Sequence, residues 1–265
     1  MYVSAMQRPR AREVDVHDLI AQQNIAPPAA HRVLALTGGA PPERLLELAR
    51  CSTPRGARLE LFALHADAAA PVEGADSLLG GAVRVEQPSV REVLRALHDT
   101  RADAVVLGYP DHARGRSAFT DIVERATAAA SVDVIVCVDR HERPWRRVLV
   151  PYLYGPLDSG ALGVARRLAR TGDAEVTVLH VVEPAGEDDD AVQPLRTRID
   201  GCNLKVVTAG DPVSAAAEEA RRGYDLIVLG GRDRLVQGRY FTMRQQRLLL
   251  TTDATLVIVH SGRQN

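Results

Sequence analysis

Aromatic residues and lysine are scarce in this sequence of 265 residues. Phe, Trp and Tyr together make up 4% of the chain, and Lys205 is its only lysine. The formal net charge is −1, so there is no overall basic field to attract polyanions. Single-stranded nucleic acid binds in basic grooves lined with aromatic side chains, and this composition does not favour such a groove. We therefore expect no nucleic-acid partner.

Cysteine is also rare, and long apolar runs are missing. Cys51, Cys137 and Cys202 are widely spaced and include no Cys-x-x-Cys pair, which argues against a disulfide framework or a zinc site and favours buried free thiols. No stretch reaches the roughly 18 uninterrupted apolar residues of a membrane helix, and the N-terminus has no signal-peptide core. These absences predict a cytoplasmic protein.

Motifs of catalysis and metal binding are missing too. The sequence has no Gly-x-Ser-x-Gly elbow and no His-x-x-x-His pair. The acidic run from Glu187 to Asp190 lacks the spaced ligands and the glycine of a calcium loop, so we interpret it as a solvated insertion. We predict that the protein is not an enzyme and holds no metal ion.

The sequence contains two copies of one unit. "RVLAL", which starts at Arg32, recurs as "RVLVP" 115 positions later, and "LFALHA", which starts at Leu61, recurs as "VTVLHV" at the same offset. "DAVVLGY" at Asp103 recurs as "DLIVLGG" 122 positions later, and "VIVCVD" at Val134 recurs as "LVIVHS" at that second offset. The difference between the offsets falls in the insertion "EPAGEDDDAVQP" of the second copy. Matches in one order along the chain indicate a duplication.

Each copy alternates apolar strands with amphipathic helices. In the second copy, strand-like runs occupy residues 147–151, 175–181, 204–210, 225–230 and 256–261. Between them, apolar residues recur at helical spacing, and Asp211-Pro212 is a cap residue followed by proline at a first turn. Another helix is expected from about Tyr240. Continuous apolar strands alternating with helices indicate a parallel sheet that is covered on both faces.

The predicted fold class is therefore α/β, with two tandem five-stranded doubly wound parallel-sheet domains. The first domain is expected over residues 32–139 and the second over residues 147–261. The charged stretch 140–146 is expected to be a linker, in which Trp145 makes an inter-domain contact. Residues 1–31, which start with several arginines and end in a Pro-Ala stretch, are expected to be a tail or tether.

The duplicated unit resembles the universal stress protein family over residues from about Arg32 to Ser261. The segments "RRVLVPYLYGPLDSGALGVARRLA", "VTVLHVVEP" and "RLLLTTDATLVIVHS" carry the resemblance. It implies an adenine-nucleotide α-hydrolase-like fold, paired domains, and regulatory rather than catalytic work. The form "VPYLYGPLDSGAL" is similar to tandem modules at the cytoplasmic C-terminal end of cation:proton antiporters.

The resemblance also implies where a nucleotide would bind. Nucleotide-binding members carry Gly, two residues, Gly, nine residues and then Gly-Ser or Gly-Thr after the fourth strand, so that backbone N–H groups and a helix N-terminus reach the phosphates. Here Gly230 fills the first position, but Asp233 stands at the second, and Met243 and Arg244 replace the final pair. The aspartate expected at the end of strand one is also missing. The ordinary ATP site is thus degraded, and its glycines are also consistent with tight turning between strand and helix.

A modified pocket in the second copy is the sharper hypothesis. Gly230-Gly231 stands where the first copy has Gly108-Tyr109, and a tyrosine ring is expected to crowd that turn. The second copy is also richer in arginine around it. A candidate ligand is an adenine nucleotide or a cyclic dinucleotide. The candidate cofactor-binding residues are Pro151, Tyr152, Gly155, Gly230, Gly231, Arg232, Asp233, Gly238 and Arg244.

Three histidines end strands at the edge where doubly wound sheets place ligands. His65 and His180 are equivalent positions after strand two, and His260 ends strand five. Without a partner at metal-ligand spacing, we interpret them as packing or surface residues.

Two functions follow from these observations. The first is a non-enzymatic cytoplasmic regulatory module at the inner face of the membrane, which controls a cation:proton antiporter or related transporter as a fused domain or a separate subunit. The alternative is a free-standing tandem universal stress protein that binds ATP or a related adenine nucleotide. A homodimer is expected in addition, with pairing through "VIVCVD" or "LVIVHS". At least one of these fifth strands should be covered by another strand, since an exposed apolar edge invites uncontrolled pairing.

Overall fold

The structure is a computed structural model, and it describes twelve parts of the chain. These are residues 29–37, 42–65, 79–84, 89–109, 118–141, 143–152, 158–171, 174–182, 184, 195–199, 201–231 and 242–262.

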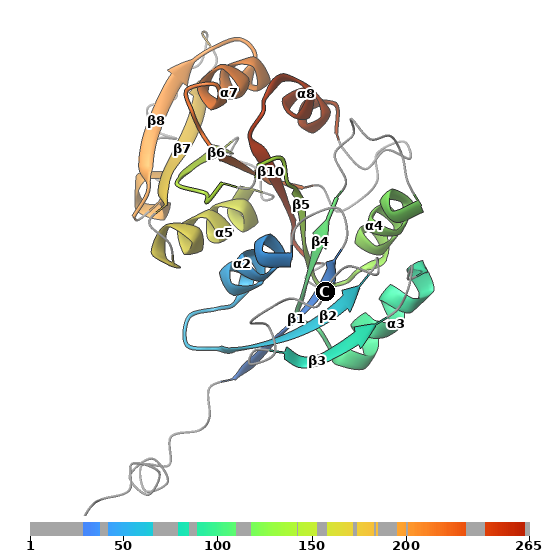
Figure 1. Ribbon diagram of the computed structural model, residues 1–265. Helices are drawn as coiled ribbons and strands as arrows, with labels where there is room; N and C mark the ends of the chain where they lie inside the picture. The colour runs from blue at the N-terminus through green and yellow to red at the C-terminus, as the bar shows by residue number, and fades with distance from the viewer. Residues whose placement is uncertain are drawn as a thin grey trace, which may run out of the picture.

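The ten strands and six helices of the described residues follow the same order in both copies of the repeat (Figure 1). The first copy contains β1 (Ala30–Thr37), α2 (Pro42–Ser52), β2 (Arg58–His65), β3 (Leu79–Arg84), α3 (Val90–Thr100), β4 (Ala104–Gly108), α4 (Ala118–Ala129) and β5 (Asp133–Val138). The second copy contains β6 (Arg147–Tyr152), α5 (Asp158–Thr171), β7 (Glu175–Val182), β8 (Asn203–Thr208), α7 (Pro212–Ala220), β9 (Leu226–Gly230), α8 (Met243–Thr251) and β10 (Thr255–His260). The expected cap at the start of α7 is present, because the Asp211 side chain accepts a hydrogen bond from the N–H of Val213 and proline follows it.

All ten strands belong to one sheet, with the order β3-β2-β1-β4-β5-β10-β9-β6-β7-β8. We call β1–β5 the first block and β6–β10 the second block. Strands are parallel within each block, and both blocks have the same internal order. The α/β fold class with two five-stranded parallel units is confirmed, and the units share one continuous sheet. β1 begins at Ala30 and so includes the last two residues of the stretch expected to be a tail.

The two blocks meet through their fifth strands. β5 and β10 pair antiparallel, with Val136 opposite Ile258 at the centre of the register. These two residues are equivalent in the repeat, so the pairing has the symmetry of the duplication itself. The prediction that a fifth strand is covered is confirmed for both strands. Since each now has a neighbour on either side, the expected pairing of two chains through "VIVCVD" or "LVIVHS" does not fit this sheet, whose outer strands are β3 and β8.

Matching hydrogen bonds close both ends of this central pair. The N–H of Arg140 donates to Oγ1 of Thr255 at 3.2 Å, and the N–H of Gly262 donates to Oδ1 of Asp133 at 2.7 Å. The donors are equivalent positions in the two copies, and so are the acceptors. The duplication therefore predicts the second bond from the first, although one acceptor is a hydroxyl and the other a carboxylate.

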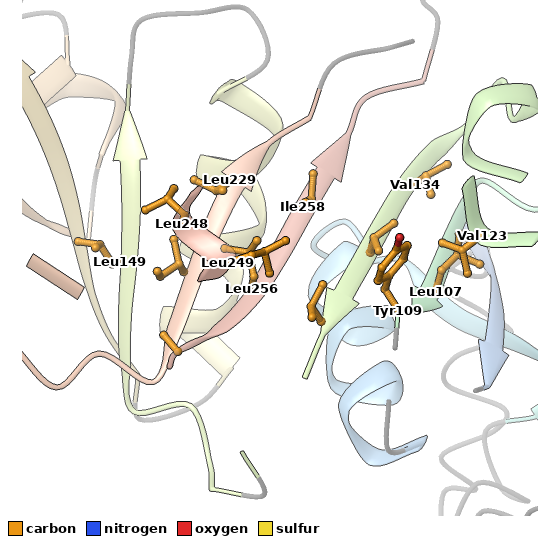
Figure 2. Packing of buried hydrophobic residues seen from close by; sticks show 14 of the residues in the cluster. Leu107, Tyr109, Val123, Val134, Leu149, Leu229, Leu248, Leu249, Leu256 and Ile258 are labelled. Atoms are coloured by element: carbon orange, nitrogen blue, oxygen red, sulfur yellow. The ribbon is translucent and has the colours of Figure 1, made fainter. Parts of the chain in front are cut away.

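Helices cover both faces of the sheet and divide the core into two layers. One layer lies under α2 and α5, which are neighbours across the boundary of the blocks, and contains residues such as Leu48 and Ala165. The other layer lies under α3, α4, α7 and α8. Figure 2 shows part of this second layer, where Leu248 and Leu249 lie against Leu229 and Leu256. Successive residues of β5 and β10 alternate between the layers, as strand geometry requires.

Two smaller predictions can be compared with this core. Cys51 and Cys137 are buried and belong to no disulfide, whereas Cys202 is only half-buried. Burial raises the pKa of the Cys137 thiol well above its ordinary value, which keeps it protonated and inert. Trp145 is 4% exposed, stacks on Arg44 of the first block, and belongs to the layer under α2 and α5, which contains residues of both blocks.

Candidate ligand site at the carboxyl ends of the second block

The predicted site lies at the edge of the sheet where β6 and β9 end. Parallel strands bring their carboxyl ends to one edge, and this places Tyr152 and Gly230 on neighbouring strands. Of the nine predicted residues, Pro151, Tyr152, Gly230, Gly231 and Arg244 can be described. The other four, Gly155, Arg232, Asp233 and Gly238, lie outside the described residues.

Tyr152 is a core residue rather than an open lining residue. Its side chain is 2% exposed and packs in the layer under α5, and its hydroxyl lies 3.4 Å from Nη1 of Arg198. The neighbouring residue on β7 is His180, which is 3% exposed and has Nδ1 3.4 Å from the carbonyl oxygen of Tyr152. Of the two interpretations for His180, the structure therefore supports packing. The side chain of His65 lies outside the described residues.

The backbone of the glycine pair is bonded inside the protein. The N–H of Gly231 donates to the carbonyl of Val259 at 2.8 Å, and Nε2 of Gln245 donates to the carbonyl of Gly230 at 3.2 Å. A phosphate would need free N–H groups at this turn. The N–H of Gly231 is not available to a phosphate, because it already donates to Val259.

The imidazole of His260 explains why position 231 is glycine. A Cβ built on Gly231 would lie 2.5 Å from two atoms of that ring, closer than real contacts allow. His260 itself is 7% exposed. Sequence reasoning expected an open turn here, but the space beside Gly231 is filled. A signal for this was present in the repeat, because the copy with Tyr109 carries valine where the other has His260.

The first block solves the same packing problem with a different ring. Tyr109 is 1% exposed, and its hydroxyl lies 3.2 Å from Oε1 of Glu124 on α4. Its ring points into the core beside Leu107 and Val123 (Figure 2). The expectation that Tyr109 crowds the turn is corrected accordingly, since the aromatic side chain fills the interior.

The N-terminus of α8 is capped by its own side chains. Thr242 accepts a hydrogen bond from the N–H of Gln245 at 3.2 Å, and the side chain of Gln245 accepts one from the N–H of Thr242 at 2.9 Å. This capping box satisfies two backbone donors that a phosphate would otherwise attract. Met243 is 76% exposed in the first turn, and Arg244 is exposed beside it.

One arginine of α8 is already engaged at this edge. Nη1 of Arg247 lies 2.6 Å from Oδ2 of Asp211, and Nη2 donates to Oγ of Ser214 at 2.9 Å. The hydrogen bond from Ser214 and the charge of Arg247 hold the pKa of Asp211 below its ordinary value. Arg247 is thus paired with a carboxylate that stays ionised, so of the two exposed arginines of α8, Arg244 is the one without an ion pair among the described residues.

Within the described parts of the chain, His, Cys, Asp and Glu side chains form no group of three suited to a metal ion. No described helix combines the length and hydrophobicity needed to cross a membrane. The arrangement offers buried packing and a partly satisfied turn.

Solved structures share this architecture. A universal stress protein from Archaeoglobus fulgidus DSM 4304 aligns with a TM-score of 0.57 at 14% identity, over 88% of this chain and 97% of that one. A protein provisionally assigned as a universal stress protein, from Pseudomonas aeruginosa UCBPP-PA14, also gives 0.57 at 14% identity, over 91% and 95% of the two chains. The chain has the universal stress protein fold.

A functionally unknown protein from Pseudomonas aeruginosa PAO1 has the same fold, with a TM-score of 0.53 at 12% identity over 88% of this chain and 93% of that one. Neither a family model nor a curated protein sequence matches the chain. At such identities the likeness establishes the fold and leaves ligand and activity to the residues themselves.

Proposed function

We propose that this protein is a non-catalytic regulatory module of the universal stress protein type, which acts by contact with a cation:proton antiporter or a related transporter at the inner face of the membrane. The transporter is either fused to the chain or a separate subunit. The segment "VPYLYGPLDSGAL", with its similarity to antiporter modules, motivates the choice of partner.

A single observation carries the proposal: backbone N–H groups at the predicted phosphate-binding turn already donate hydrogen bonds within the protein. The N–H of Gly231 and, at the start of α8, the N–H groups of Thr242 and Gln245 all donate to protein atoms. A module that works by contact with a partner does not need those groups free, whereas an ATP-binding module does. Any nucleotide would bind in the second block, beside Arg244 and the arginines that precede α8 in the sequence.

Calorimetry with the full chain tests the ligand part. ATP, ADP and AMP should give no saturable heat at micromolar concentrations, and a cyclic dinucleotide is the remaining nucleotide class to titrate. Saturable ATP binding would support the alternative, a free-standing adenine-nucleotide-binding stress protein. If a nucleotide binds, Arg232→Glu should abolish binding and Arg114→Glu should leave it intact. The reverse result would place the site in the first block.

Inverted membrane vesicles test the transporter part. Vesicles from source cells with and without the gene should differ in how strongly added Na⁺ or K⁺ dissipates a respiration-driven pH gradient. Adding the purified chain back should restore the difference if the chain is a separate subunit. Identical traces in both vesicle types would contradict regulation of an antiporter.

A further inference from the structure

Residues 139–141 and 143–146, here called the strap, run from the end of β5 to the start of β6. The strap begins on the second block. The hydroxyl of Thr255 donates to Oδ1 of Asp139 at 2.9 Å, and the guanidinium of Arg140 donates to the carbonyl of Thr252. These contacts fix the first turn of the strap against the start of β10.

The last residue of the strap, Arg146, is held by the second block: its N–H donates to Oδ2 of Asp225 at 3.0 Å, and its carbonyl accepts from the N–H of Glu175 at 2.7 Å. The middle of the strap is held by one side chain of the first block. Arg44 on α2 donates to the carbonyls of His141 (3.3 Å) and Arg143, and its guanidinium carbon lies 4.6 Å from the centre of the Trp145 ring. Stacking of a guanidinium on an indole is favourable when both groups are removed from water. These contacts between the strap and α2 therefore all involve Arg44.

Arg44 depends on the strap in return. Its side chain is only 10% exposed, and its nearest carboxylates are Glu47, 3.3 Å from Nη1, and Asp139, 4.0 Å from Nε. A buried cation is stable only while its partners remain in place. The closed strap and the buried arginine thus stabilise each other, so the two should be lost together.

The repeat shows that this arrangement is not a requirement of the fold. The position equivalent to Arg44 in the second copy is Ser159, which has no cation to offer. The second block therefore folds without an arginine at this position, so the contacts of Arg44 are specific to the first block.

We propose that the strap opens and closes locally while the ten-stranded sheet stays intact, and that Arg44 is its latch. Apart from Arg146, whose carbonyl bonds to the first residue of β7, the strap makes no backbone pairing with the sheet, so opening of its middle leaves the β5–β10 pairing in place. Opening withdraws Trp145 from the core layer that includes Leu48 of α2 and Ala165 of α5. The strap thus has a closed and an open conformation at the boundary of the blocks. This holds for any ligand or partner of the protein.

Trp145 is the only tryptophan in the chain, so its fluorescence reports on the strap directly. Arg44→Ala should shift the emission to longer wavelength and increase quenching by acrylamide. In hydrogen exchange, peptides over 139–146 should exchange about tenfold faster or more, while β5 and β10 keep their wild-type rates. Arg50→Ala, an exposed arginine on the same helix, is the matched control and should change neither signal.

Two outcomes would overturn the proposal. The first is an unchanged emission spectrum of Trp145 in Arg44→Ala. The second is an equal increase in the hydrogen-exchange rates of the strap and of β5 and β10. If Arg44→Ala does not fold, the wild-type protein decides the question. The exchange rates of its strap amides should not depend on low concentrations of denaturant, because these amides exchange by local opening. Strap amides that exchange only through global unfolding would contradict a strap that opens separately.

Discussion

Gly231 and His260 together fill a space that Tyr109 and Val138 fill in the first block. All four positions lie at the carboxyl ends of the fourth and fifth strands of their blocks, and three of the side chains are buried there. Each block thus places one ring here: Tyr109 at the end of the fourth strand in the first block, and His260 at the end of the fifth strand in the second block. Glycine at position 231 is the consequence of the ring at position 260, so these two residues should behave as one packing unit.

A double-mutant cycle tests this unit. Gly231→Ala should lower the free energy of unfolding by about 1–3 kcal/mol, because its Cβ collides with the His260 ring. In a His260→Ala background, where the ring is gone, the same change should cost at least about 1 kcal/mol less. Urea unfolding measures both.

The matched control for this cycle is Gly210→Ala. A Cβ at Gly210 meets no atom within 4 Å. It should change stability by less than about 0.5 kcal/mol in either background. Equal costs of Gly231→Ala with and without the ring would contradict the packing unit.

At the scale of elements, the edge strand β8 is tied to α7 through a buried carboxylate. Glu219 is 6% exposed, and Nζ of Lys205 lies 2.6 Å from its Oε2 while the hydroxyl of Tyr224 donates to its Oε1 at 3.1 Å. Burial raises the pKa of Glu219, but hydrogen bonds from Lys205 and Tyr224 outweigh burial and hold it below the ordinary value. The only lysine of the chain thus fastens an outer strand to the helix beside it.

This tie makes stability depend on pH in acid. Because the pKa of Glu219 is lower in the folded state, its contribution is complete above the unfolded pKa near 4.5 and is lost as pH falls below it. The free energy of unfolding of Glu219→Gln should therefore decline less steeply below pH 5 than that of the wild type. Lys205→Met should cost only about 1 kcal/mol at pH 7, since the lysine is 34% exposed and partly screened.

Urea unfolding between pH 3.5 and 7 measures these slopes. Glu218→Gln alters an exposed carboxylate one residue away and should follow the wild-type curve. Parallel curves for Glu219→Gln and the wild type would show that the buried carboxylate does not contribute in this way.

The elements themselves were largely predictable from the sequence. The repeat, the apolar strands and the Asp211-Pro212 cap depend on local patterns, and those patterns agree with the packing. The site was less predictable, because His260 and Gly231 are nearly thirty residues apart and meet only once β9 and β10 pair. The capping box of α8 is readable in the sequence, since Thr242 and Gln245 stand three residues apart just before an apolar run.

At the scale of the whole molecule, the duplication determines how the blocks join. An antiparallel pair of equivalent strands is self-complementary only if equivalent residues lie opposite each other at its centre, as Val136 and Ile258 do. Each is fully buried in the layer under α3, α4, α7 and α8. The sequence predicted that another strand would cover a fifth strand. It did not determine whether that other strand belongs to the same chain or to a second chain. The continuous sheet now implies that the two blocks depend on each other for stability.

Val136→Thr tests this dependence with almost no change in volume. Burying a hydroxyl at the centre of the β5–β10 pair should cost about 1–3 kcal/mol. If the blocks unfold as one unit, hydrogen exchange of the most protected amides should accelerate equally in β4 and in β9, although Val136 belongs to only one block. Val206→Thr on the outer strand β8, where the side chain is 44% exposed, should leave both unchanged. Acceleration confined to β4 and β5, with β6 and β9 at wild-type rates, would show that the blocks are independent folding units that merely share a sheet.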